Sequence, residues 1–107
     1  MKNNRLYVLV RKDLCCSAPY VQAGHVVAKF CLEASDAVQW NNQYLIYLGV
    51  NDVHELKRWK FKFTKRGIDT YEFHEPDNEL FDDKTLTGFC GLVDEENAGF
   101  LSKLDIL

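Results

Sequence analysis

Two short apolar runs, each followed by a helix-start signal, constrain the fold of this 107-residue chain more than any other feature. Residues 5–10 (RLYVLV) and 44–50 (YLIYLGV) lack the apolar–polar alternation of a half-exposed strand, which predicts strands buried on both faces. Pro19 follows the first run and Asp52 follows the second, and both residue types favour a helix N-terminus. A strand followed by a helix, twice in succession, predicts parallel strands covered by helices.

The first helix is predicted from the spacing of its apolar residues. They recur at helical intervals and would form a core-facing stripe made of Ala23, Val26, Val27, Phe30, Cys31 and Ala34. Gln22, His25 and Lys29 fall within about 60° of one another on a different face, at 100° per residue. These three polar side chains are therefore expected to be able to act on one ligand.

The second helix is predicted from its ends. Asp52 followed by Glu55 resembles a capping box, and Gly67 suits a helix C-terminus. A strand is the competing interpretation, because aromatic residues at positions 59, 61 and 63 alternate with lysines. The helix is favoured because its start and stop signals agree with each other.

The remaining segments complete the predicted order. Residues 70–75 and 85–93 are expected to form two further strands joined by a polar loop, and residues 94–107 a terminal helix. The predicted fold is a single α/β domain with the order βαβαββα, in which helices pack on both faces of a four-stranded mixed sheet.

Composition and charge narrow the class of protein. The chain has four cysteines without CxxC spacing, no apolar run approaching the ~20 residues of a membrane span and no secretion signal, so we expect a cytoplasmic protein that contacts no membrane. Neither a metal nor an organic cofactor is expected. Acidic residues are concentrated between positions 69 and 83, where a hard-cation site is a minor alternative to a solvated loop.

Positive charge is concentrated just before this acidic segment, although the net charge is −3. No acidic residue interrupts the basic set Lys57, Arg58, Lys60, Lys62, Lys65 and Arg66. Such a set can attract phosphates, and the aromatic residues between the lysines could stack on bases. The alternative is an amphipathic helix that buries Trp59 and Phe63 and leaves its charges in solvent.

Gln22 and His25 are candidate site residues because ligands of open α/β sheets bind beyond the carboxyl ends of the strands. Histidine can transfer protons near neutral pH, and glutamine can donate and accept hydrogen bonds at once. An ordinary helix surface is the alternative. The sequence contains no GxSxG, GxGxxG or P-loop motif.

The chain resembles the type II peptidyl-tRNA hydrolase family over nearly its whole length, 1–107. The resemblance rests on the order of several short motifs: RKDL after the first strand, Gln22-x-x-His25, Trp40, the Glu55-Leu56 pair, Gly67-Ile68 and the strand TLTGFCG. It implies an α/β fold that cleaves the ester between a peptide and the 3′ end of tRNA without a cofactor. A homodimer stays open as the assembly.

The resemblance also implies a set of site residues. The family's catalytic carboxylate corresponds to Glu75 and its threonine to Thr85, with Gln22 or His25 assisting. The family's lysine corresponds to Ala18, which cannot supply a charge, and Arg11 or Lys12 could approach from the strand end instead. We expect Arg11 and the basic set to contact tRNA.

Three functions remain open from the sequence. The first is a divergent peptidyl-tRNA hydrolase. The second is a catalytically impaired module that binds tRNA, another nucleotide-bearing ligand or a protein, which Ala18 favours. The third is a hydrolase that acts on a different small ester or amide.

Overall fold

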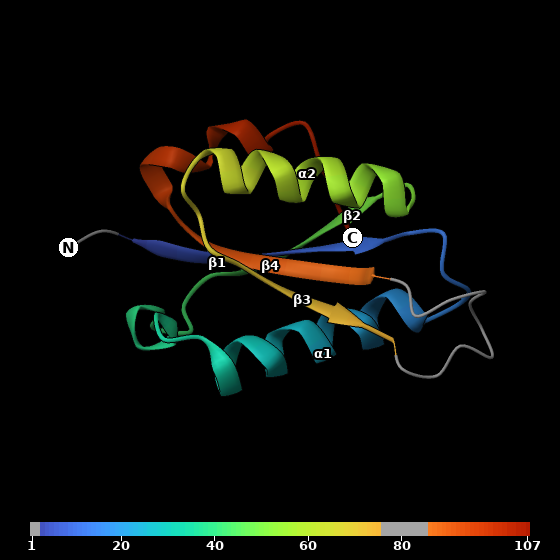
Figure 1. Cartoon of the computed structure of the whole chain (residues 1–107), viewed down its shortest axis with the longest axis horizontal. Coiled ribbons are helices and arrows are strands. Elements are labelled where there is room, and N and C mark those ends of the chain that lie inside the picture. Colours follow the sequence, from blue (N-terminus) through green and yellow to red (C-terminus); the bar gives the residue numbers. More distant parts are fainter. Residues whose placement is uncertain (1–2, 76–85) are drawn as a thin grey trace.

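A computed structural model describes residues 3–75 and 86–107, and in it one mixed sheet separates two layers of helix (Figure 1). Five strands lie in the order β3-β4-β1-β2-β5. Helix α1 covers one face, and α2 and η2 cover the other. The elements follow one another as β1 (Asn4–Arg11), α1 (Ala18–Glu33), η1 (Ala37–Gln39), β2 (Leu45–Val50), α2 (Val53–Lys65), β3 (Thr70–His74), β4 (Leu86–Asp94), η2 (Glu95–Leu101) and β5 (Asp105–Ile106).

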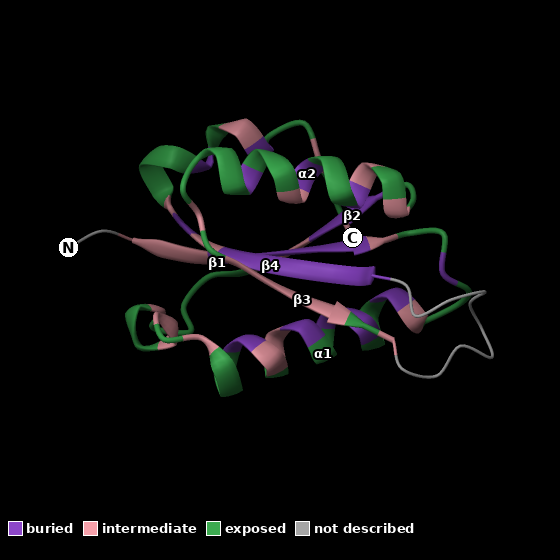
Figure 2. Ribbon diagram, viewed as in Figure 1, coloured by how far each residue is buried: buried purple, intermediate pink, exposed green. Residues whose placement is uncertain are grey.

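Strand β1 lies at the centre of the sheet, parallel to β2 and antiparallel to β4. Leu6, Val8 and Val10 pack in the core under α1, whereas Tyr7 and Leu9 pack in the core under α2. Burial on both faces explains why this strand shows no alternation in its sequence. Figure 2 shows the buried strands between helices whose outer surfaces are exposed.

Helix α2 forms where the end signals predicted it. The Asp52 carboxylate accepts a hydrogen bond from the Glu55 backbone N–H at 2.9 Å, and Gly67 has a φ of 75° just beyond the helix. A positive φ suits glycine because it has no Cβ. Trp59 and Phe63 are buried and Phe61 is exposed, which is the arrangement of an amphipathic helix and excludes the competing strand.

The predicted terminal helix over residues 94–107 is wrong, and so is the count of four strands. The segment instead forms the 3₁₀ helix η2 and then β5, which pairs antiparallel with β2. Ala98, Leu101 and Leu104 recur every third residue, and this period fits three residues per turn better than 3.6. Strand β5 then pairs with an edge of β2 that would otherwise be open.

The α/β class and the placement of helices on both faces are confirmed. Within the described residues, no helix combines the length and the apolar character needed to cross a membrane. The cysteines differ in their surroundings: Cys15, Cys16 and Cys31 are exposed and Cys90 is buried. Cys31 therefore does not belong to the core stripe that the sequence predicted. Burial raises the pKa of the Cys90 thiol to about 12, which suits a core residue rather than a nucleophile.

Candidate functional site

The candidate site lies where β1 and β3 end and where α1 and β4 begin. Figure 1 shows these four chain positions at one end of the molecule, to the right. Because β3 and β4 are antiparallel, the end of one lies beside the start of the other. Glu75 directly follows β3, and Thr87 is the second residue of β4. This edge of the sheet therefore brings together side chains that are far apart in the sequence.

Gln22 is the centre of a hydrogen-bonded chain at this edge. It is 5% exposed, although the helical pattern predicted a separate polar face. Its Nε2 donates to the Glu75 carboxylate at 2.7 Å, and its Oε1 accepts from the Thr87 hydroxyl at 2.8 Å. Both ends of the amide are engaged, so Gln22 is fixed in orientation and in turn positions the carboxylate.

Thr87 reaches Gln22 because β4 carries a β-bulge. Phe73 of β3 pairs with Gly88 and His74 pairs with Leu86, which leaves Thr87 as the extra residue. Leu86 and Phe89 both pack in the core under α2 although they are three residues apart. The bulge turns Thr87 toward α1, where it is fully buried. Bulges commonly redirect a side chain in this way.

His25 lies one turn of α1 further along and is exposed. Its ring stacks on Phe73 with centroids 4.7 Å apart and an interplanar angle of 7°. In the described part of the chain it has no hydrogen-bond partner. The stacking fixes the ring plane beside β3, and the ring nitrogens can still bind a ligand.

Arg11 and Lys12, at the end of β1, are both paired with acids. Ala18, at the position where the family resemblance implies a lysine, is the first residue of α1. Arg11 donates to Asp13 from Nε at 2.9 Å and from Nη2 at 2.8 Å, which lowers the pKa of Asp13. Lys12 lies 3.8 Å from Asp105. The carboxylates reduce the local positive charge that either residue offers to a substrate.

The basic set of helix α2 lies over the opposite face of the sheet from Gln22 and His25. Lys60 forms an ion pair with Glu72 at 2.5 Å and is half-buried. Burial raises the pKa of Glu72, but hydrogen bonds from Lys60 and His74 lower it by more, so the net shift is downward. The other five members of the set, Lys57, Arg58, Lys62, Lys65 and Arg66, are exposed.

A groove runs between α2 and the edge strand β3. It has a volume of about 390 Å³ and is lined by Lys57, Lys60, Phe61, Thr64, Glu72, His74 and Leu86. Phe61 is 62% exposed, with Lys65 Nζ 5.7 Å from its ring centroid, so part of an aromatic surface is accessible beside these cations. Leu86 is the neighbour of Thr87 in β4, and the groove therefore ends close to the edge that carries the candidate site.

Two of the four predicted catalytic residues, Gln22 and Glu75, are in contact in the structure. A third, His25, lies three residues after Gln22 on α1. Thr85 and the acidic residues from 77 to 83 lie outside the described residues. Among the residues that are described, no three His, Cys, Asp or Glu side chains gather in a way that could hold a metal.

Thr87 is a member of the site that the sequence did not predict. The TLTG segment contains two threonines, Thr85 and Thr87, and strict alternation would have turned Thr87 to the same face as Phe89. Only the bulge, which has no clear sequence signal apart from the adjacent Gly88, reverses its direction.

Comparison with known proteins gives evidence on the fold. No family model and no curated protein matches the chain. Among solved structures, a protein of unknown function from Agrobacterium tumefaciens is similar, with a TM-score of 0.70 and 11% sequence identity. The match covers 100% of this chain and 99% of that one. At this identity the likeness concerns the fold alone.

Proposed function

We propose that the protein is a divergent peptidyl-tRNA hydrolase that cleaves the ester between a peptide and the 3′ end of tRNA. The observation that carries this proposal is the hydrogen bond from Gln22 to Glu75. The buried Thr87 hydroxyl donates a second hydrogen bond to Gln22 and holds it in place. Gln22 and Glu75 are the glutamine and the carboxylate that the family resemblance selected. They come from segments 53 residues apart and meet at the sheet edge where ligands of α/β proteins bind.

Ester hydrolysis needs a water molecule that is oriented toward the carbonyl carbon. Glu75 would accept a hydrogen bond from this water and take its proton as the water attacks. The peptide then leaves as a carboxylic acid, and the tRNA 3′ oxygen needs a proton, which a protonated His25 would donate. The resemblance implies that Thr85 would position the ester. Thr85 lies outside the described residues.

Binding of the tRNA would use the basic set on α2. Five of its six side chains are exposed to solvent, and these can neutralise phosphates. Phe61 would supply a stacking surface for an unpaired base in the groove beside β3. A tRNA that reaches both this set and Glu75 must cross the edge of the sheet at β3, because the two lie on opposite faces.

The second candidate is a binding module that retains the scaffold but lacks catalysis. Two observations favour it: Ala18 occupies the position of the expected lysine, and Arg11 is engaged by Asp13 through two hydrogen bonds. A hydrolase needs donors or a positive charge for the developing oxyanion. A binding module has no such requirement and would use the α2 cations alone.

Incubation of the purified protein with an N-blocked aminoacyl-tRNA separates the two candidates. Enzyme-dependent release of the blocked amino acid supports the hydrolase. Binding of the same tRNA without release supports the module. Absence of both activities at low salt contradicts both candidates. Cytoplasmic location is part of the same proposal and rests on the use of tRNA as substrate.

A further inference from the structure

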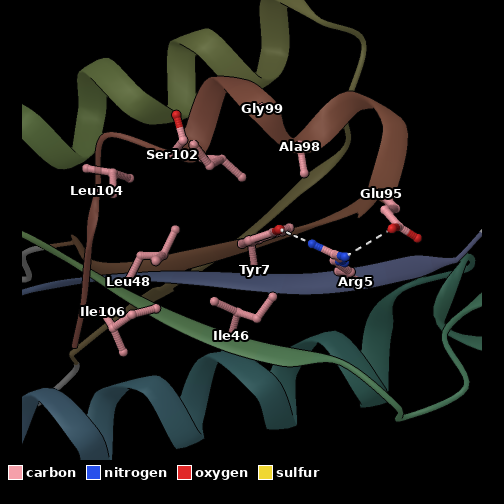
Figure 3. Close-up of a pocket in the computed structure, with 11 residues that line it drawn as sticks. Arg5, Tyr7, Ile46, Leu48, Glu95, Ala98, Gly99, Ser102, Leu104 and Ile106 are labelled. Atoms are coloured by element: carbon pink, nitrogen blue, oxygen red, sulfur yellow. Dashed lines mark hydrogen bonds and ion pairs between the residues drawn. The ribbon is translucent and has the colours of Figure 1, made fainter.

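A second pocket lies on the α2 side of the sheet, away from the candidate site. The segment from η2 to Leu104 passes over β1 and β2 and borders an open pocket of about 500 Å³ (Figure 3). This volume is within the range of small-molecule sites, which combine apolar walls with a few convergent polar groups. The pocket is made entirely of described residues, and none of them belongs to the site proposed above.

The two ends of this pocket differ in chemistry. Ile46, Leu48, Leu101, Leu104 and Ile106 form an apolar end. Figure 3 shows Arg5, Tyr7 and Glu95 together at the other end, with dashed lines from Arg5 to both neighbours. A ligand that fits would therefore carry an apolar body and a compact polar group.

The hydrogen bonds of Arg5 are only partly made. Nη1 lies 3.4 Å from the Tyr7 hydroxyl and Nη2 lies 3.5 Å from Glu95 Oε1, both long for charged pairs. Its Nε is buried and has no hydrogen-bond partner in the part of the chain that the structure describes. A ligand would therefore use Nη1 and Nη2, which make only these two long contacts, while the guanidinium lies over the Tyr44 ring at 5.3 Å from its centroid. A carboxylate matches the planar guanidinium best.

Glu95 selects among carboxylate ligands. A simple fatty acid would bring a second negative charge beside this residue, which is unfavourable. A ligand with both a carboxylate and an ammonium group would instead match both charges of the Arg5–Glu95 pair. Free α-amino acids have this arrangement on a single carbon. The apolar end then requires an apolar side chain.

We infer that this pocket binds a free apolar α-amino acid, with its carboxylate on Arg5 and Tyr7, its ammonium group on Glu95 and its side chain among the leucines and isoleucines. This inference is independent of the proposed hydrolase activity, because no residue is shared between the two sites. Binding between the η2 segment and the sheet would also hold that segment more firmly in place.

The test is a titration of the full chain with leucine, in which binding is measured by the shifts of amide signals in ¹H–¹⁵N NMR spectra. Three analogues each lack one recognised feature: N-acetylleucine lacks the ammonium group, leucinamide lacks the carboxylate and glycine lacks the apolar body. Leucine is expected to shift the signals of the pocket residues. Each analogue is expected to bind at least about tenfold more weakly.

Two variants assign the charges. Arg5→Met is expected to remove the preference for leucine over leucinamide, and Glu95→Gln the preference for leucine over N-acetylleucine. Glu96→Gln serves as the control, because Glu96 is exposed and does not line the pocket. If Arg5→Met does not fold, the affinities of the wild-type protein for leucine and its analogues still test the inference. Absence of shifts well above about 1 mM leucine, or equal binding of octanoate or N-acetylleucine, overturns the inference.

Discussion

The Thr87 hydroxyl donates a 2.8 Å hydrogen bond to the side chain of Gln22, 65 positions away in the sequence. Both residues are buried, and the bond exists because the β4 bulge turns Thr87 toward α1. Gln22 passes this constraint on to Glu75, whose carboxylate it contacts at 2.7 Å. Thr87 therefore acts on the proposed water-binding carboxylate through another side chain and is a positioning residue.

Thr87→Val is expected to destabilise the protein by about 1–3 kcal/mol. Valine has nearly the same shape but leaves the buried Gln22 oxygen without its donor. Urea unfolding measures the change. Thr64→Val is the matched control, because Thr64 is exposed on α2 and donates to the Lys60 backbone oxygen of its own helix, so its effect should stay within about 0.5 kcal/mol. Equal effects of the two substitutions would show that the Gln22 bond contributes no stability.

Gly91→Ala is expected to cost about 1–3 kcal/mol through overpacking. A Cβ at this position would lie 2.8 Å from the ring of Phe63, which belongs to α2, and 3.0 Å from Ile68, which follows that helix. Gly24→Ala on α1 is the opposite case, since its Cβ would meet nothing within 4 Å and alanine favours a helix by about 1 kcal/mol. Thermal unfolding of both variants should show changes of opposite sign. A stable Gly91→Ala protein would contradict the close packing of α2 on β4.

Lys57→Ala is expected to weaken tRNA binding and to lower the salt dependence of binding by about one unit of slope. Lys57 is exposed and lines the groove beside β3. Fluorescence anisotropy at several salt concentrations measures both effects. Lys103→Ala is the control, because Lys103 is exposed in the segment after η2 and does not line the groove. If both variants lose the same affinity, the basic set of α2 has no special role.

The ion pair between Lys60 and Glu72 predicts a pH dependence of stability. Glu72 has a lowered pKa in the folded protein, so it contributes stability above the ordinary glutamate pKa of about 4.3 and loses it as the pH falls through the lower folded value. The free energy of unfolding of Glu72→Gln should therefore approach that of the wild type as the pH is lowered toward acid. A difference between the two proteins that is constant with pH would contradict the lowered pKa.

The sequence predicted the elements whose signals were local. The strand at 5–10, the helix that begins at Pro19 and the helix between Asp52 and Gly67 follow from burial on both faces and from end signals that do not depend on distant residues. The prediction of a helix in the C-terminal segment was wrong, because the apolar residues there recur every three positions and because β5 forms only when β2 offers an edge.

The site was predicted in part. Gln22 and Glu75 were selected, and the structure brings them into contact. The burial of Gln22 was not predicted, because helical periodicity put it on a polar face and gave no sign of Thr87 behind it. A bulge changes the direction of a side chain without changing the composition of the strand, so Thr87 could be recognised only from the pairing of β3 with β4.

The most direct test of the proposed function is the release of a blocked amino acid from N-blocked aminoacyl-tRNA by the wild-type protein and by Glu75→Gln. Glu33→Gln is the control, since Glu33 is exposed at the far end of α1. We predict release by the wild type and by Glu33→Gln, and a rate at least about 100-fold lower for Glu75→Gln, as expected for loss of a general base. No release by the wild type, or equal release by Glu75→Gln, would contradict catalysis by this carboxylate.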